Sequence, residues 1–291
     1  MTPRRSSVAR RVLRLAALLI LPYLLVMGLL AGCQRHLIYF PRTATEMNQR
    51  AEPAATGLLP WVDAAGQTIG WRGEPPAGRP RPAARLLVVH GNAGSAVDRA
   101  YFVRGFGAVG GGGIWDVSIL EYPGYGARPG QPGEASLMAA AREAVQQLQR
   151  EDDRPVHVLG ESLGSGVAGG LAAAFPDAVK GLVLITPFTR LPDVGSHHYP
   201  WLPVRLILRD RYDTVAALER YRGPVAIVVA GRDEVIPAEF GRRLYAAYAG
   251  PKRLWEQAAA GHNTLDYHPG AAWWSEVSEF LLHAKPVAQN P

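Results

Sequence analysis

Short apolar runs alternate with longer amphipathic segments along most of this chain of 291 residues. The short runs are rich in Val, Ile and Leu and predict buried strands at residues 85–89, 116–122, 155–159, 181–185 and 225–229, with a last strand near 253–257. The longer segments predict helices at 98–107, 134–150, 165–175, 238–249 and 271–283. Buried strands that alternate with helices are typical of a mostly parallel sheet with helices on both faces, so we predict an α/β fold.

Other segments near the N-terminal half predict an edge hairpin and two loops. Leu58–Val62 and Thr68–Trp71 flank a turn and predict an antiparallel hairpin at the edge of the sheet. The stretch 74–82, which is rich in Pro, Gly and Arg, predicts a loop, and the four glycines at 110–113 predict a flexible one. These glycines lack the spacing of a phosphate-binding loop, so a nucleotide site is not expected.

Residues 1–32 form a separate segment, which we predict to be a signal peptide or a membrane anchor. Residues 15–31 are almost wholly apolar, and five arginines precede them without any acidic residue: Arg4, Arg5, Arg10, Arg11 and Arg14. Because a positive flank stays in the cytoplasm, we expect the rest of the chain outside it, tethered to the cell membrane or outer membrane of a bacterial envelope.

Cys33, the single cysteine of the chain, closes this apolar segment. Leu30-Ala31-Gly32-Cys33 looks like a bacterial lipobox, in which the cysteine receives lipid and the leader is removed. We predict lipid attachment at Cys33, and an uncleaved anchor is the alternative because 17 apolar residues are long for a signal peptide. Residues 33–56 are a predicted connector, and the aromatic and apolar stretch 37–42 is expected to pack against the domain or the membrane surface.

Composition supports one folded domain and argues against one class of partner. Hydrophobic residues make up 48% of the chain and charged residues 19%, which predicts a packed core over residues 57–285, with a flexible tail at 286–291. The net charge of +6 comes mainly from the five leader arginines, since the remainder holds 26 basic and 25 acidic residues. The charge balance therefore gives no support for a nucleic-acid partner.

A candidate nucleophile, Ser162, stands between a predicted strand and a predicted helix. Gly160-Glu161-Ser162-Leu163-Gly164 has the Gly-x-Ser-x-Gly spacing of a nucleophile elbow, where the glycines remove Cβ atoms that would clash in the sharp turn. A serine hydroxyl needs an adjacent base, and that base needs a carboxylate to orient it. We predict His262 as the base and Asp233 as the carboxylate, because each lies in a loop after a predicted strand and they follow in the order Ser, Asp, His.

The sequence offers other candidates for both partners of Ser162. Glu234 and Asp193 are the alternative acids, and the alternative bases are His197, His198, His268 and His283. The His197-His198 pair has no acidic or histidine partner at metal-ligand spacing, so no metal site is expected.

Acyl transfer also requires N–H donors for the oxyanion of the tetrahedral intermediate. One candidate is the backbone N–H of Leu163, at the start of the helix after the nucleophile. The second is the backbone N–H of Asn92, within His90-Gly91-Asn92-Ala93-Gly94 after an early strand. Gly91 would let the backbone approach a substrate closely, and His90 is expected to hold the loop.

Together these motifs resemble those of the α/β-hydrolase superfamily, in particular a membrane-anchored subfamily with an HGNAG motif. The matching stretches are His90 to Gly94, Glu121-Tyr122-Pro123-Gly124-Tyr125-Gly126, Gly160 to Gly164, Asp233 to Pro237 and Gly261-His262-Asn263, and the resemblance covers about residues 34–283. It implies an α/β-hydrolase fold with a short cap insertion and no cofactor. Relatives of this type include esterases, protein depalmitoylases and lysophospholipase-like enzymes.

We therefore predict a membrane-tethered serine hydrolase that cleaves ester or thioester bonds of a small-molecule or lipid-like acyl substrate. A peptidase or amidase is the first alternative, although no acidic cluster that would hold a free amine surrounds the motifs. A non-catalytic envelope binding protein on the same fold is the second. Residues 190–223 lie where many hydrolases insert a lid, and they form either a small cap that lines an acyl pocket or an ordinary packed excursion.

Overall fold

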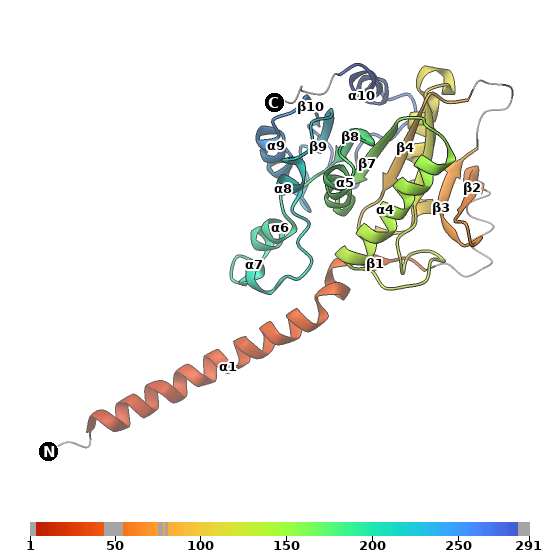
Figure 1. The fold of residues 1–291 in the computed structure, drawn as a ribbon. Helices are drawn as coiled ribbons and strands as arrows, with labels where there is room; N and C mark the ends of the chain where they lie inside the picture. The colour runs from red at the N-terminus through yellow and green to blue at the C-terminus, as the bar shows by residue number, and fades with distance from the viewer. Residues whose placement is uncertain (1–3, 44–54, 75–77, 79–80, 285–291) are drawn as a thin grey trace.

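The computed structural model describes residues 4–43, 55–74, 78 and 81–284, so the predicted tail at 286–291 and residues 44–54 of the predicted connector lie outside the described residues. Its centre is an eight-stranded sheet (Figure 1). In spatial order the strands are β10 (Lys252–Gln257), β9 (Val225–Ala230), β8 (Val179–Ile185), β7 (Val156–Glu161), β4 (Ala84–Val89), β6 (Trp115–Leu120), β3 (Thr68–Gly73) and β2 (Leu58–Val62). Strands β10 to β6 are parallel, and β3 and β2 form the predicted antiparallel hairpin at the edge.

Two apolar clusters cover the two faces of this sheet, which confirms the predicted α/β-hydrolase fold. Alternate residues of β4 separate them: Leu87 and Val89 belong to one cluster, and Leu86 and Val88 to the other. The first cluster is covered by α4 (Glu134–Glu151), α5 (Leu163–Ala174), α8 (Thr214–Leu218) and α9 (Ala238–Ala247). The second is covered by α3 (Ala100–Ala108) and α10 (Ala272–His283).

Three local predictions are adjusted by the structure. The helix predicted at 98–107 is divided into a 3-10 turn, η1 (Ala96–Arg99), and the helix α3. The glycines predicted as a flexible loop form most of a second 3-10 turn, η2 (Val109–Gly112), where Gly110 and Gly111 have φ of 59° and 68°. Helix α5 begins at Leu163, directly after Ser162, and not at residue 165.

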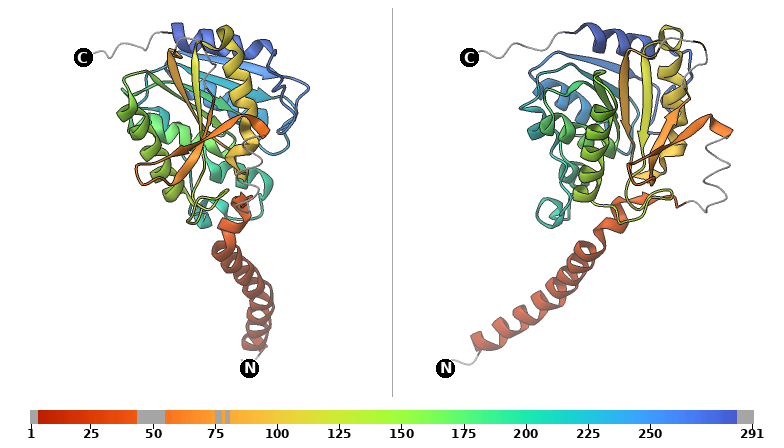
Figure 2. Two further views of the ribbon diagram at one scale, coloured as in Figure 1. Left: turned by 90° about the vertical axis from the view of Figure 1, so that its right-hand side faces the viewer. Right: turned by 45° about the vertical axis from the view of Figure 1, so that its right-hand side comes forward.

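The N-terminal helix α1 (Arg4–Ile38) extends away from the domain (Figures 1 and 2). Residues 9–38 of it are long and apolar enough to cross a membrane. The helix passes through Cys33 and ends at Ile38, so the predicted connector begins inside it. Strand β1 (Phe40–Pro41) then pairs with β5 (Ala93–Gly94), and Tyr39 is buried, so part of the stretch 37–42 packs against the domain, whereas Leu37 and Phe40 are exposed.

The insertion after β8 forms a small cap, residues 190–213, on the side of the domain that α1 reaches (Figures 1 and 2). It contains α6 (Leu191–His198) and the single-turn helix α7 (Val204–Ile207). The side chain of Gln34 joins α1 to this cap: its Nε2 donates to the Ile207 carbonyl (3.3 Å), and its Oε1 accepts from the Arg209 N–H (2.7 Å). The cap is therefore bonded directly to the end of α1 that is nearest the domain.

Candidate active site

Ser162 occupies a strained turn between β7 and α5. Its φ of 53° and ψ of −117° lie outside the regions that residues with a side chain usually adopt. A Cβ atom at Gly160 would overlap the carbonyl oxygen of Gly164, and one at Gly164 would overlap that of Val89. The two glycines therefore allow the tight turn that projects Ser162 beyond the end of the strand.

The structure brings Ser162, His262 and Asp233 into one hydrogen-bonded chain. His262 Nε2 lies 3.0 Å from Ser162 Oγ, and His262 Nδ1 lies 2.7 Å from Asp233 Oδ2. The three residues follow β7, β10 and β9, whose carboxyl ends meet at one edge of the parallel sheet. The other carboxylate oxygen, Asp233 Oδ1, accepts from the N–H groups of Val235 (2.8 Å) and Ile236 (2.7 Å), so the fully buried carboxylate is held in one orientation.

In the described part of the chain, none of the alternative acids and bases is hydrogen-bonded to Ser162 or to His262. Glu234 is exposed, and Asp193 pairs with Arg205. His198 Nε2 lies 2.8 Å from the Val235 carbonyl, the His197 ring packs edge-on against Phe240, His268 Nδ1 accepts from the Gly270 N–H, and His283 ends α10. Within the described part of the chain, no group of three or more His, Cys, Asp and Glu side chains is placed to hold a metal ion.

Asn92 and Leu163, the two predicted oxyanion donors, both line the pocket beside Ser162. Leu163 is the first residue of α5, where N–H groups have no acceptor within the helix. The backbone carbonyl of Asn92 fixes this loop, because it accepts hydrogen bonds from the Phe40 N–H (2.9 Å) and from the Tyr125 hydroxyl (2.7 Å). The Asn92 side chain also donates to the Ile38 carbonyl (2.7 Å), so the end of α1 is bonded to this loop.

His90 lies beneath the Asn92 loop, as predicted. It is fully buried, its Nδ1 lies 2.8 Å from the Gly91 carbonyl, and its ring packs on Tyr122 and Tyr125. The hydroxyl of Tyr122 donates to the His90 carbonyl (3.0 Å). These contacts fix the loop from below and leave its outer side to the pocket.

A partly buried ion pair next to the nucleophile was not predicted. Glu161 accepts from Arg99 Nε (2.8 Å), from the Tyr101 hydroxyl (2.6 Å) and from the Gly91 N–H (3.3 Å). Burial alone would raise the pKa of the Glu161 carboxyl, but Arg99 and the Tyr101 hydrogen bond lower it below its ordinary value, so the group stays ionised. Tyr267, in the loop after His262, lies 3.5 Å from the same carboxylate. Glu161 thus connects the turn at Ser162 with the Gly91 loop and with the loop that follows His262.

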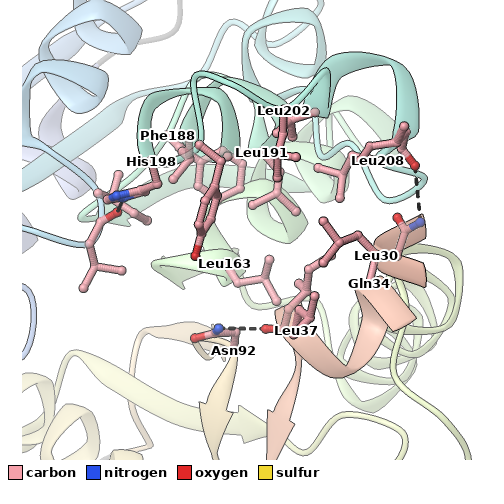
Figure 3. A pocket seen from close by; sticks show the side chains of 18 of the residues that line it. Leu30, Gln34, Leu37, Asn92, Leu163, Phe188, Leu191, His198, Leu202 and Leu208 are labelled. Carbon is pink, nitrogen blue, oxygen red and sulfur yellow. Dashed lines mark hydrogen bonds between the residues drawn. The ribbon is translucent and has the colours of Figure 1, made fainter. Parts of the chain in front are cut away.

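A pocket of about 640 Å³ opens beside Ser162, between the cap and α1 (Figure 3). Apolar side chains make up most of its wall, so the structure gives the cap a pocket-lining position. From the domain and its cap these are Leu163, Phe188, Leu191, Val194, Trp201, Leu202, Val204, Ile207, Leu208, Val235 and Ile236. Helix α1 and the residues after it contribute Leu30, Ala31, Leu37, Ile38 and Phe40. The contribution of α1 has no signal in the sequence, where these residues belong to a leader and a connector.

Comparison with known proteins identifies the class. Residues 84–218 match the family model described as the alpha/beta hydrolase fold. Uncharacterized protein Rv2307c of Mycobacterium tuberculosis is 36% identical over 270 residues, which are 88% of this chain and 90% of that protein. The chain therefore belongs to the α/β-hydrolase superfamily and is a hydrolase of this fold.

More distant similarities extend to two proteins whose names state an activity and to further solved structures. Lysophosphatidylserine lipase ABHD12 from Danio rerio is 28% identical over 191 residues, 58% of this chain and 48% of that protein. Est1E from Butyrivibrio proteoclasticus superposes with a TM-score of 0.61 at 19% identity, over 78% of this chain and 98% of that one. Paleococcus ferrophilus monoacylglycerol lipase has a TM-score of 0.53 at 20% identity, over 69% and 95%. At these identities the solved structures show the shared fold.

Proposed function

We propose that this hydrolase is a membrane-tethered serine enzyme that cleaves ester or thioester bonds of acyl or lipid-like substrates through an acyl-enzyme intermediate. The observation that carries the proposal is the chain of hydrogen bonds from Asp233 through His262 to Ser162, which ends at an apolar pocket. No cofactor is needed for this chemistry.

His262 Nε2 accepts the hydroxyl proton as Ser162 Oγ attacks the acyl carbon. Asp233 keeps the other ring nitrogen protonated and stabilises the imidazolium. The negative oxygen of the tetrahedral intermediate receives hydrogen bonds from the backbone N–H groups of Asn92 and Leu163. When the intermediate collapses, the bond from carbon to the leaving oxygen or sulfur breaks and His262 returns the proton to the leaving group. Water then attacks the acyl-serine by the same steps, which releases the acid.

The apolar wall of the pocket is evidence that the part of the substrate bound there is an acyl chain. Its volume of about 640 Å³ lies within the usual range for small-molecule sites, and its lining is almost free of charge. Lysophosphatidylserine lipase and monoacylglycerol lipase, two of the similar proteins, are by name lipases of single-chain lipids. An acyl chain in this groove would place its carbonyl next to Ser162.

The tether is α1, with the catalytic domain outside the cytoplasm because the arginines lie at the far end of the helix. Two forms of the tether follow from the sequence: lipid on Cys33 after removal of the leader, or a retained helix. Leu30 and Ala31 line the pocket, and the Tyr23 hydroxyl donates to the Trp201 carbonyl (3.3 Å). These contacts favour the retained helix, because removal of residues 1–32 would open one wall of the pocket.

Labelling with a fluorophosphonate probe tests the serine chemistry. We expect the wild-type protein and Ser136→Ala to be labelled and Ser162→Ala to be unlabelled, since Ser136 lies on α4 away from the pocket. Matched p-nitrophenyl esters, acyl thioesters and anilides then separate the bond types. Preferred cleavage of the anilide would support the peptidase or amidase alternative, and absence of labelling would support a non-catalytic binding protein.

A further inference from the structure

The uncharged part of α1 has the length of a bilayer core. No charged residue lies between Arg14 and Arg35, and the 20 residues at positions 15–34 would span about 30 Å as a helix, which is the thickness of the hydrocarbon layer. In a spanning helix Arg35 therefore lies at the membrane surface on the side of the domain. Arg209 lies at the same level, because its N–H is bonded to the side chain of Gln34.

The cap extends past this level, toward the middle of the helix. Tyr23, which donates to the Trp201 carbonyl, precedes Arg35 by 12 residues, or about 18 Å along the helix axis. Figures 1 and 2 show α6 and α7 at the end of the domain from which α1 emerges, with α10 at the opposite end. A domain that sat wholly in water above the membrane could not make the contact between Tyr23 and Trp201.

The part of the cap that reaches furthest carries large apolar side chains without a protein covering. We call Tyr199, Trp201 and Leu206 the cap tip; Leu206 is 85% exposed and Trp201 62% exposed. Leu37 at the end of α1 and Phe40 are also more than half exposed. Large apolar side chains exposed on so small a cap mark an interaction site, and their position beside a helix of membrane-spanning length points to lipid as the occupant.

The pocket opens on the same side. Leu30 and Ala31 in its wall precede Arg35 on α1 by five and four residues, which places them about 6–8 Å into the hydrocarbon layer of a spanning helix. Trp201 and Leu202 of the cap line the facing wall. Exposed arginines at positions 35, 209 and 211 surround the level of the membrane surface, where they would face anionic or zwitterionic head groups.

We infer that the cap tip inserts into the lipid bilayer beside α1 and that substrate enters the pocket laterally from the membrane. The substrates are then ester lipids that reside in the bilayer, with the acyl chain moving from the hydrocarbon layer into the pocket and the head group remaining near the arginines. This route rests on the proposed function and adds the source of the substrate and its physical class.

Spin labelling tests the insertion without any catalysis. With Cys33→Ser removing the single cysteine, Leu206→Cys places one label on the cap tip and Glu279→Cys places the control on α10. In full-length protein reconstituted in phosphatidylcholine vesicles, we expect the label at 206 to collide with oxygen more than with a water-soluble nickel chelate, and the label at 279 to show the reverse. A water-like label at position 206 would overturn the inference.

Kinetics test the lateral route. Leu206 does not line the pocket, so Leu206→Glu should leave turnover of a short water-soluble ester within twofold of wild type. The charge would oppose insertion, so kcat/KM for a lysophospholipid presented in vesicles should fall by about tenfold or more, and Leu206→Met should retain it. An equal effect of Leu206→Glu on both substrates would overturn the route. A wild-type protein that is inert to the soluble ester and the fluorophosphonate would instead refute the proposed function, while the spin labels would still report insertion.

Discussion

Replacement of Asp233 by Asn is the most informative test of the proposed triad. Asp233 Oδ1 accepts two backbone N–H groups, so the Asn carbonyl must take this position and its NH₂ group must face His262. An NH₂ group donates, so His262 Nδ1 must become the acceptor and Nε2 must carry the proton. That tautomer points N–H at Ser162 Oγ and cannot remove the hydroxyl proton.

The expected loss is therefore that of a triad with the wrong tautomer, about 10⁴ in kcat, or about 5 kcal/mol of transition-state stabilisation. The side chains are nearly identical in shape, so the thermal unfolding midpoint should change little. Turnover of a short soluble ester and the rate of fluorophosphonate labelling give the two readouts. Glu234→Gln is the matched control, because it removes a neighbouring exposed carboxylate and should remain near wild type. If Asp233→Asn kept more than a tenth of the wild-type kcat, or if Glu234→Gln were the more damaging change, the assignment of the carboxylate would be wrong.

Three further predictions concern the nucleophile, the tether and a buried histidine. Ser162→Ala should lower kcat by about 10⁴ to 10⁶ without unfolding the protein, and retained turnover in a clean preparation would contradict the role of Ser162. The mass of protein extracted from its native membrane should equal that of the full-length chain, and Cys33→Ser should change it only by the mass of the substitution. A shorter chain with added lipid at Cys33 would instead show the lipoprotein form. Burial lowers the pKa of His157 to about 4, below its value near 6.5 in the unfolded chain. The contribution of this neutral histidine to the free energy of unfolding is therefore complete above pH 6.5 and is lost as the pH falls toward 4, which amounts to about 2 kcal/mol between pH 7 and pH 5. Urea unfolding at the two pH values should show this loss of unfolding free energy in the wild type and a smaller loss in His157→Asn. Equal losses in the two proteins would show that a group other than His157 causes the pH dependence.

Much of the fold could be predicted because it is encoded over short distances along the chain. The apolar runs at 85–89 and 225–229 lie within β4 and β9, whose residues are buried on both faces. The glycines around Ser162 are required by a backbone turn of five residues, so the elbow could be recognised from neighbouring residues alone. Prediction was wrong in detail at three places: the start of α5, the helix predicted at 98–107, which is a 3-10 turn followed by α3, and the glycines of η2, which form a 3-10 turn and not a flexible loop. Each difference concerns only a few residues.

The sequence by itself determined the alternation of strands and helices, the turn at Ser162 and the order of the candidate residues, because periodicity and backbone sterics act locally. Only the tertiary structure decided which histidine lies 3.0 Å from Ser162, since His262 is 100 residues away and four other histidines were alternatives. It also decided that Glu161 pairs with Arg99 and that α1 supplies a wall of the pocket. These contacts join segments that are remote in sequence, and the packing of the sheet, the cap and α1 determines which of them meet.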